Sequence, residues 1–248
     1  MPNSMEPLTL ALVFATFFFA AFLKGTAGLG FATTCLGIMA AYLDMRLAIP
    51  LVIIPSLLSN ALVMIDAGGF LPILRRFWVL YLGAIPGLAF GLWVLGSGST
   101  DLPRLVLGTA MFLYGAWGLW GGTIHLRQNK PLDAVMGLAT GTVNGLTGSQ
   151  IMPILPYLMS LDITKDELVQ AINTSFTMAS VIMLLGLGKL GLVNTEVLLV
   201  SAAGLIPVAL GIRVGGRIRS RLPEAVFRRI VLGMIALLGL GLIVRSIG

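Results

Sequence analysis

Charged residues are scarce in this chain: Asp, Glu, Lys and Arg make up 10% of its 248 residues, whereas an ordinary soluble domain contains about 25%. Stretches almost without charge cover residues 7–23, 47–65, 77–100 and 105–123. A helix of ~20 apolar residues crosses the ~30 Å hydrocarbon layer of a membrane. These stretches do not alternate between apolar and polar residues, as barrel strands would. The sequence therefore predicts an all-α polytopic membrane protein.

Residues that carry chemistry are also few. Cysteine and histidine occur once each, as Cys35 and His125, which excludes an intramolecular disulfide and predicts no metal site. The segment GTAGLG at 25–30 lacks the G-x-G-x-x-G order and follows no strand, and no Walker A motif occurs, so we expect no nucleotide cofactor. No set of nucleophile, base and acid can be assembled. We therefore expect neither an enzyme nor a bound cofactor or metal.

The net charge of +6 does not indicate a nucleic-acid partner. Basic residues fall in short loops between apolar spans, as the positive-inside rule describes for membrane proteins. Such residues also lie near anionic lipid headgroups. The predicted partner is therefore the lipid bilayer and not a nucleic acid.

An internal duplication organises the chain. When the sequence is shifted by 120 residues, KGTAG at 24–28 lies over NGLTG at 144–148, and Leu102-Pro103 lies over Leu222-Pro223. The shared order and offset of these matches indicate two similar halves. We place them at residues 1–124 and 125–248, and together they form one transmembrane domain.

Each half contains three plain spans and one interrupted segment. The spans are expected near 47–66, 77–97, 104–122, 168–187, 194–213 and 226–245. The interrupted segments, 7–43 and 131–161, have a glycine-rich motif near the middle. Each can be read as one crossing helix or as a hairpin that enters the membrane and returns.

The distribution of basic residues favours the hairpin. With two hairpins, the basic residues outside the motifs divide 11 to 4 between the two faces; with two crossings they divide 9 to 6. In the hairpin model the smaller group is Arg46, Arg104, Lys189 and Arg245, and both termini face the periplasm. About thirty residues make ~45 Å of helix, too little for two crossings, so we expect the arms of the second hairpin to stop near the midplane. The predicted fold is an inverted repeat of two halves, each a re-entrant helical hairpin plus three transmembrane helices.

The two hairpin tips, Lys24–Gly30 and Asn144–Gln150, are the candidate binding site. Glycine permits a sharp reversal and close approach of a ligand to the backbone. The helix that follows each tip offers free N–H groups and the positive end of its dipole, which suits an anion. Asparagines on the next span of each half are costly to bury and complete the candidate set. The predicted substrate-binding residues are Lys24, Gly25, Thr26, Gly28, Asn60, Asn144, Gly145, Thr147, Gly148, Ser149, Gln150 and Asn173.

Among these residues, Lys24 is the strongest indication of an anion-binding site. A lysine near the bilayer centre costs ~2.5 to 3.5 kcal/mol on insertion scales, and a bound anion would compensate it. The alternatives are a lysine that snorkels to the interface or one that pairs with Asp44 or Asp66. For the serines and threonines near Asn60 and Asn173, a bond to the preceding helical turn is the ordinary alternative to ligand binding.

The two tips, KGTAGLGFA and NGLTGSQIMP, together with GIRVGGRIRSRLPEAVFRRIV near the C-terminus, resemble the TauE/SafE family of sulfite exporters. The resemblance implies a secondary transporter in the bacterial cytoplasmic (inner) membrane for sulfite or a related sulfur-containing or organic anion, such as a sulfonate. Alternating access with the anion held between the tips is the predicted mechanism; an anion channel or a scaffold subunit is the alternative. The sequence leaves open the substrate, the direction, a coupling proton or other ion, and a homodimer.

Overall fold

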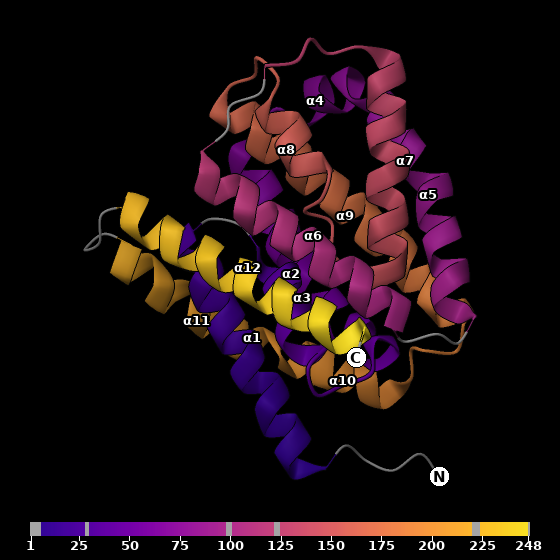
Figure 1. The fold of residues 1–248 in the computed structure, drawn as a ribbon, viewed down its shortest axis with the longest axis vertical. Helices are drawn as coiled ribbons and strands as arrows, with labels where there is room; N and C mark the ends of the chain where they lie inside the picture. Colours follow the sequence, from indigo (N-terminus) through magenta and orange to yellow (C-terminus); the bar gives the residue numbers. More distant parts are fainter. Residues whose placement is uncertain (1–5, 28–29, 98–100, 122–124, 220–223, 248) are drawn as a thin grey trace.

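The computed structural model describes residues 6–27, 30–97, 101–121, 125–219 and 224–247, and all regular secondary structure in these ranges is helical (Figure 1). The helices in chain order are α1 (Pro7–Ala27), α2 (Phe31–Met39), α3 (Met45–Ala67), α4 (Phe70–Arg76), α5 (Trp78–Gly96), α6 (Asp101–Trp120), α7 (Lys130–Thr147), α8 (Ile154–Met159), α9 (Lys165–Lys189), α10 (Thr195–Ala203), α11 (Leu205–Arg219) and α12 (Glu224–Ile247). Within the described ranges, five stretches are long and apolar enough to cross a membrane: α1, α3, α5, α9 and the combined α10 and α11. The prediction of an all-α polytopic membrane protein is confirmed.

The expected spans match α3, α5, α6, α9 and α12 to within a few residues. The expected span at 194–213 is instead divided into α10 and α11 at Gly204. Pro207 explains the division, because proline has no N–H to donate to the residue four positions earlier and its ring crowds that carbonyl. In α3 a similar gap is filled from outside: Pro55 leaves the carbonyl of Leu51 free, and the hydroxyl of Ser201 donates to it at 2.7 Å.

The first segment of each half folds back on itself. In the first half, the hydroxyls of Thr16 on α1 and Tyr42, just beyond α2, lie 3.0 Å apart. In the second half, Tyr157 on α8 donates to Asp133 at the start of α7 at 2.6 Å. The two arms of each segment differ in length: α1 and α7 have 21 and 18 residues, whereas α2 and α8 have 9 and 6. At 1.5 Å per residue, each first arm is about as long as the hydrocarbon layer is thick.

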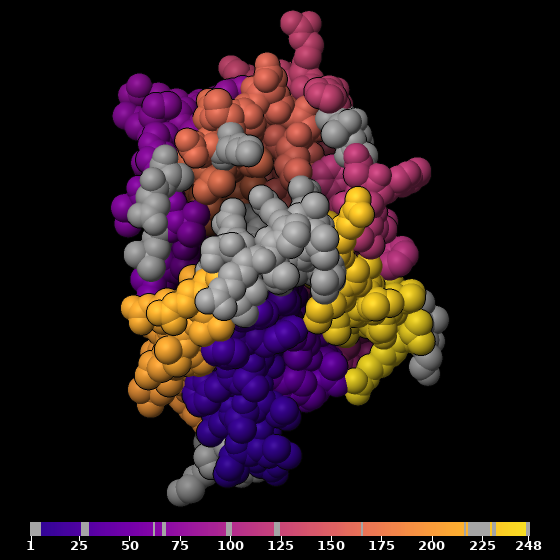
Figure 2. Space-filling model, turned by 90° about the vertical axis from the view of Figure 1, so that its left-hand side faces the viewer, coloured from indigo at the N-terminus to yellow at the C-terminus, as the bar shows by residue number. Residues whose placement is uncertain are grey.

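The long helices pack in pairs that join the two halves: α1 with α11, α5 with α7, α3 with α9, and α6 with α12. On one face of the molecule, α1 lies between α11 and α12 (Figure 2). Glycines bring the backbones together at these contacts. A Cβ atom at Gly87 of α5 would lie 2.1 Å from the carbonyl oxygen of Leu138, and one at Gly141 of α7 would lie 2.1 Å from that of Ala84. Close approach through small residues is the usual way for helices to associate in a membrane.

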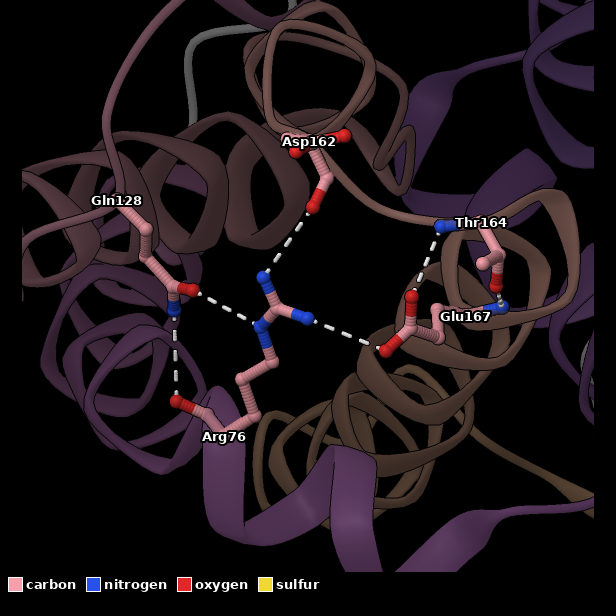
Figure 3. A network of polar contacts seen from close by, with 5 residues as sticks. All are labelled: Arg76, Gln128, Asp162, Thr164 and Glu167. Atoms are coloured by element: carbon pink, nitrogen blue, oxygen red, sulfur yellow. Dashed lines mark hydrogen bonds and ion pairs between the residues drawn. The ribbon is translucent and has the colours of Figure 1, made fainter.

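A polar network ties the loops around the second hairpin to α4. The guanidinium of Arg76 donates to Gln128 at 3.0 Å, to Glu167 at 3.1 Å and to the carbonyl of Asp162 at 3.5 Å (Figure 3). Glu167 in turn accepts from the backbone N–H of Thr164, whose hydroxyl caps α9. These contacts bring the entry to α7 and the exit from α8 to the same end of the molecule.

Candidate functional site

Lys24 is buried at the end of α1, with 8% of its surface exposed. Its ammonium donates to the hydroxyl of Ser59 at 2.9 Å and to the side-chain oxygen of Asn60 at 3.2 Å, both on α3. These two partners are neutral. They hold the ammonium in place without cancelling its charge, so the end of α1 presents a fixed positive charge inside the molecule.

Of the two acids that we considered as partners for Lys24, Asp44 does not pair with it. Asp44 is exposed and caps α3, where it accepts from the backbone N–H of Arg46 at 2.7 Å. The side chain of Asp66 lies outside the described residues. Snorkelling to the interface is contradicted by the burial of Lys24 and by its bonds to α3.

A cavity of about 40 Å³ adjoins this ammonium. Both halves of the chain line it, and Lys24 is the one charged side chain among the described residues of the lining. The polar lining residues are Lys24, Thr33, Ser56, Asn60, Asn144, Gln150, Asn173 and Ser180. Apolar side chains such as Phe31, Ile49 and Phe176 close the rest of the wall.

Several polar atoms in this lining are buried without a hydrogen-bond partner. They are the hydroxyl of Ser56, both the oxygen and the nitrogen of the Asn144 amide, and the side-chain oxygen of Gln150. Buried polar groups are nearly always paired, and an unpaired one points to an unseen water or ligand. Three such side chains surround one cavity beside a buried ammonium, an arrangement whose chemistry suits a polar, negatively charged species.

The two interrupted segments meet at this cavity. The hydroxyls of Thr33 on α2 and Ser149 in the second tip lie 2.7 Å apart, and both side chains are buried. Gly148 has φ +72°, which glycine adopts without strain, and a Cβ atom there would lie 3.0 Å from both Leu36 and Ile49. Only a residue without a side chain fits this turn, so the second tip can lie directly against α2 and α3.

Helix ends contribute differently in the two halves. Gly30, Phe31, Ala32 and Thr33 line the cavity, so the first turn of α2 faces it, and the first N–H groups of a helix have no partner within that helix. The second half does not repeat this arrangement. There, α8 begins at Ile154, beyond the lining, and the second tip contributes the side chains of Asn144 and Gln150 instead. Of the two helix N-termini that the sequence predicts at the site, that of α2 lines the cavity and that of α8 does not.

The structure separates the predicted site residues into two groups. Lys24, Asn60, Asn144, Gly148, Gln150 and Asn173 line the cavity. Gly25 and Gly145 instead lie at helix contacts: a Cβ atom at Gly25 would lie 2.5 Å from the carbonyl oxygen of Ile212, and one at Gly145 would lie 2.3 Å from that of Leu88. The hydroxyl of Thr147 donates to the carbonyl of Val143 at 2.7 Å and accepts from the N–H of Ser149 at 3.1 Å, which shapes the tip.

Gly28 and the side chain of Thr26 lie outside the described residues. Thr33 was not among the predicted residues, although it lines the cavity and joins α2 to the second tip. Within the described ranges, no three side chains of His, Cys, Asp and Glu come together as a metal ion would require.

The apolar helices, the paired halves and the buried polar cavity define a polytopic helical membrane protein with an internal polar cavity. No curated protein and no solved structure matches the chain significantly. The model of the sulfite exporter TauE/SafE family matches residues 13–242, nearly the whole chain, and the chain belongs to this family. It is therefore a multi-pass membrane transporter of the anion exporter class.

Proposed function

We propose that this transporter carries a small oxyanion, sulfite or a close relative, by alternating access, and that the anion binds in the cavity beside Lys24. The observation that carries this proposal is the buried ammonium with two neutral partners. An uncompensated charge inside a membrane protein is costly and marks substrate or ion pathways. An anion in the cavity would compensate it.

The size of the cavity favours an inorganic anion over a larger organic one. A single water needs ~10–15 Å³ of such space, so the cavity of about 40 Å³ takes a group of about three or four heavy atoms. Sulfite has four. A sulfonate with a further carboxylate would require the cavity to open.

We infer that the two halves form an inverted repeat with re-entrant hairpins, as the sequence predicts. In support, α1 packs with α11 as α7 packs with α5, so equivalent helices have equivalent partners. In Figure 1, α1 rises from the end that carries the N-terminus, whereas α7 descends from the end that carries α4 and α8. Sites at the interface of such repeats, on broken helices, are typical of secondary transporters.

A channel or a scaffold subunit is the alternative. A carrier saturates and exchanges labelled for unlabelled substrate across a sealed membrane, whereas a channel conducts without exchange and a scaffold does neither. Counterflow of labelled sulfite in proteoliposomes that contain the purified protein separates the three.

Substitution of Lys24 by methionine tests the site itself. The methionine keeps a long apolar stem and removes the charge, so the protein is expected to melt at or above the parental temperature. A hydrogen bond to a charged group contributes about 1.5 to 3 kcal/mol, so sulfite affinity is expected to fall roughly ten- to a hundredfold. Titration calorimetry and a melting curve on one preparation measure both.

The matched control is Lys189→Met, which removes the same charge from an exposed lysine at the end of α9. It is expected to leave sulfite affinity unchanged. A Lys24→Met protein that is destabilised yet binds sulfite as the parent does would show that Lys24 serves the fold and not the anion.

A further inference from the structure

We propose that the cavity selects an oxyanion that has one negative charge and still carries a proton, such as hydrogen sulfite, over dianions such as sulfate. This selectivity, which rests on the proposed function of the same cavity, follows from the charge and the orientation of the lining groups. The selectivity concerns the protonation state and charge of the substrate as well as its chemical class.

The charge of the lining favours an anion with one negative charge. Lys24 is the one charged, and the one titratable, side chain among the described residues that line the cavity. One ammonium balances one negative charge. A dianion would keep its second charge uncompensated in surroundings that exclude water, and burial strongly disfavours an unpaired charge.

The orientations of two side-chain amides favour a ligand that can donate a hydrogen bond. The nitrogen of the Gln150 amide donates to the carbonyl of Phe176 at 3.4 Å. A backbone carbonyl can only accept, so the nitrogen must face it, and the amide oxygen is left buried without a partner. The nitrogen of the Asn173 amide also donates to a backbone carbonyl, that of Val169 at 2.8 Å, so the oxygen is the part of this amide that can accept. The lining of the cavity therefore includes hydrogen-bond acceptors.

The same cavity also has hydrogen-bond donors. Lys24 uses two of its three N–H bonds for Ser59 and Asn60, and the first N–H groups of α2 have no partner within the helix. Asn144, with both its oxygen and its nitrogen unpaired, can serve either role. The cavity thus joins one positive charge to a mixture of donors and acceptors.

Anions differ in how many of these donors and acceptors they can pair with. The oxygens of a fully deprotonated anion only accept, so such an anion satisfies the donors but leaves the oxygen of Gln150 unpaired. Hydrogen sulfite with its proton on oxygen can accept from the donors and can also donate to the oxygen of Gln150. A site with buried polar groups strongly rejects a ligand that leaves them unpaired.

The test compares three probes on the purified full-length protein: sulfite, sulfate and methanesulfonate. Affinities are measured by calorimetry from mildly acidic to mildly alkaline buffer, across the second ionisation of sulfite. Affinity for total sulfite is expected to fall with rising pH in step with the fraction of hydrogen sulfite. Methanesulfonate is a monoanion that neither donates nor titrates in this range, so it reports any titration of the protein. Sulfate is expected to bind at least about tenfold more weakly than hydrogen sulfite.

Gln150→Leu provides a second readout. It removes the acceptor, so hydrogen sulfite is expected to lose about tenfold in affinity while methanesulfonate changes by less than about twofold. The pH series on the parent protein needs no variant, so a failure of Gln150→Leu to fold leaves the test intact.

Three results would overturn the selectivity. Sulfate that binds as tightly as sulfite, with both lost in Lys24→Met, would leave the anion site standing but remove the preference for a protonated monoanion. Sulfite affinity that rises with pH and requires added sodium would assign the amide oxygens to a cation. Binding of all three probes that is unaffected by Lys24→Met would overturn both this selectivity and the proposed function.

Discussion

Among the described side chains, the partners of Lys24 hold its buried charge without neutralising it. Its partners, Ser59 and Asn60, accept hydrogen bonds but carry no charge. The hydroxyl of Ser59 also donates to the carbonyl of Ser56 at 3.1 Å within the same helix, which fixes its direction. A carboxylate at either position would hold the ammonium more strongly and would also repel an anion. The neutral partners therefore leave the positive charge available to a ligand.

Asn60→Asp tests this point with nearly no change in shape. The new carboxylate would pair with Lys24 and repel an anion in the cavity, so sulfite affinity is expected to fall at least about tenfold. Thermal stability is expected to be retained, because the ammonium keeps a partner. Calorimetry with sulfite and a melting curve measure the two effects.

Asn194→Asp is the matched control. Asn194 caps α10 by accepting from the N–H of Val197 at 2.8 Å, and aspartate caps a helix as well as asparagine does. This variant is expected to bind sulfite as the parent does. Parental affinity in Asn60→Asp would contradict the role given to the charge of Lys24.

Among the elements, the contact between α5 and α7 depends on backbone proximity. A Cβ atom at Gly141 would lie 2.1 Å from the carbonyl oxygen of Ala84, so Gly141→Ala requires the two helices to separate. Overpacking of this kind costs about 1 to 3 kcal/mol, and the melting temperature is expected to fall. Gly241→Ala in α12 is the control: no described atom beyond the neighbouring backbone of α12 itself lies within 4 Å of the added Cβ, and alanine favours a helix over glycine by about 1 kcal/mol. Equal melting temperatures for the two variants would show that the contact tolerates separation.

The contact between α2 and the second tip is the next feature that can be tested. Thr33 and Ser149 come from different halves and share a buried hydrogen bond of 2.7 Å. If this bond fixes the cavity, Thr33→Val and Ser149→Ala should affect sulfite affinity through the same contact. The double variant is then expected to lose less than the sum of the single losses, with a coupling of about 0.5 to 3 kcal/mol. Additive losses, measured by calorimetry on all four proteins, would show that the tips act independently.

At the scale of the whole molecule, the lining residues that could be predicted from the sequence are those whose burial is expensive. Residues whose role depends on a neighbour in space could not be predicted. Lys24, Asn60 and Asn173 could be predicted because charges and amides in apolar segments need partners. Thr33 could not, since a threonine in a helix ordinarily bonds to its own preceding turn. Gly25 and Gly145 were predicted to bind the ligand but lie at helix contacts. Glycine permits both ligand approach and helix contact, and only the position of Ile212 and Leu88 shows that these two serve helix contact.

The orientation of the molecule in the membrane depends on how its basic residues divide between its two ends. One end carries the network of Arg76, Gln128 and Glu167 (Figure 3). At the other end, the guanidinium of Arg46 donates to the carbonyls of Leu95 and Gly96, which close α5, and Arg245 donates to the carbonyl of Ala41. The hairpin model places the first end in the cytoplasm and the second in the periplasm, because most basic residues in loops belong to the first.

Cysteine labelling decides between this orientation and its alternatives. Cys35 is buried, so Cys35→Ala gives a background without native thiols, and single cysteines are then placed at Arg127 and Lys189, which are both exposed. In intact cells, a reagent that cannot cross the membrane is expected to label Lys189→Cys and to leave Arg127→Cys unlabelled until the cells are opened. The reverse pattern would invert the orientation and place both termini in the cytoplasm. Labelling of both positions from outside would mean that the chain crosses once more between them, which would remove the hairpin from the second half.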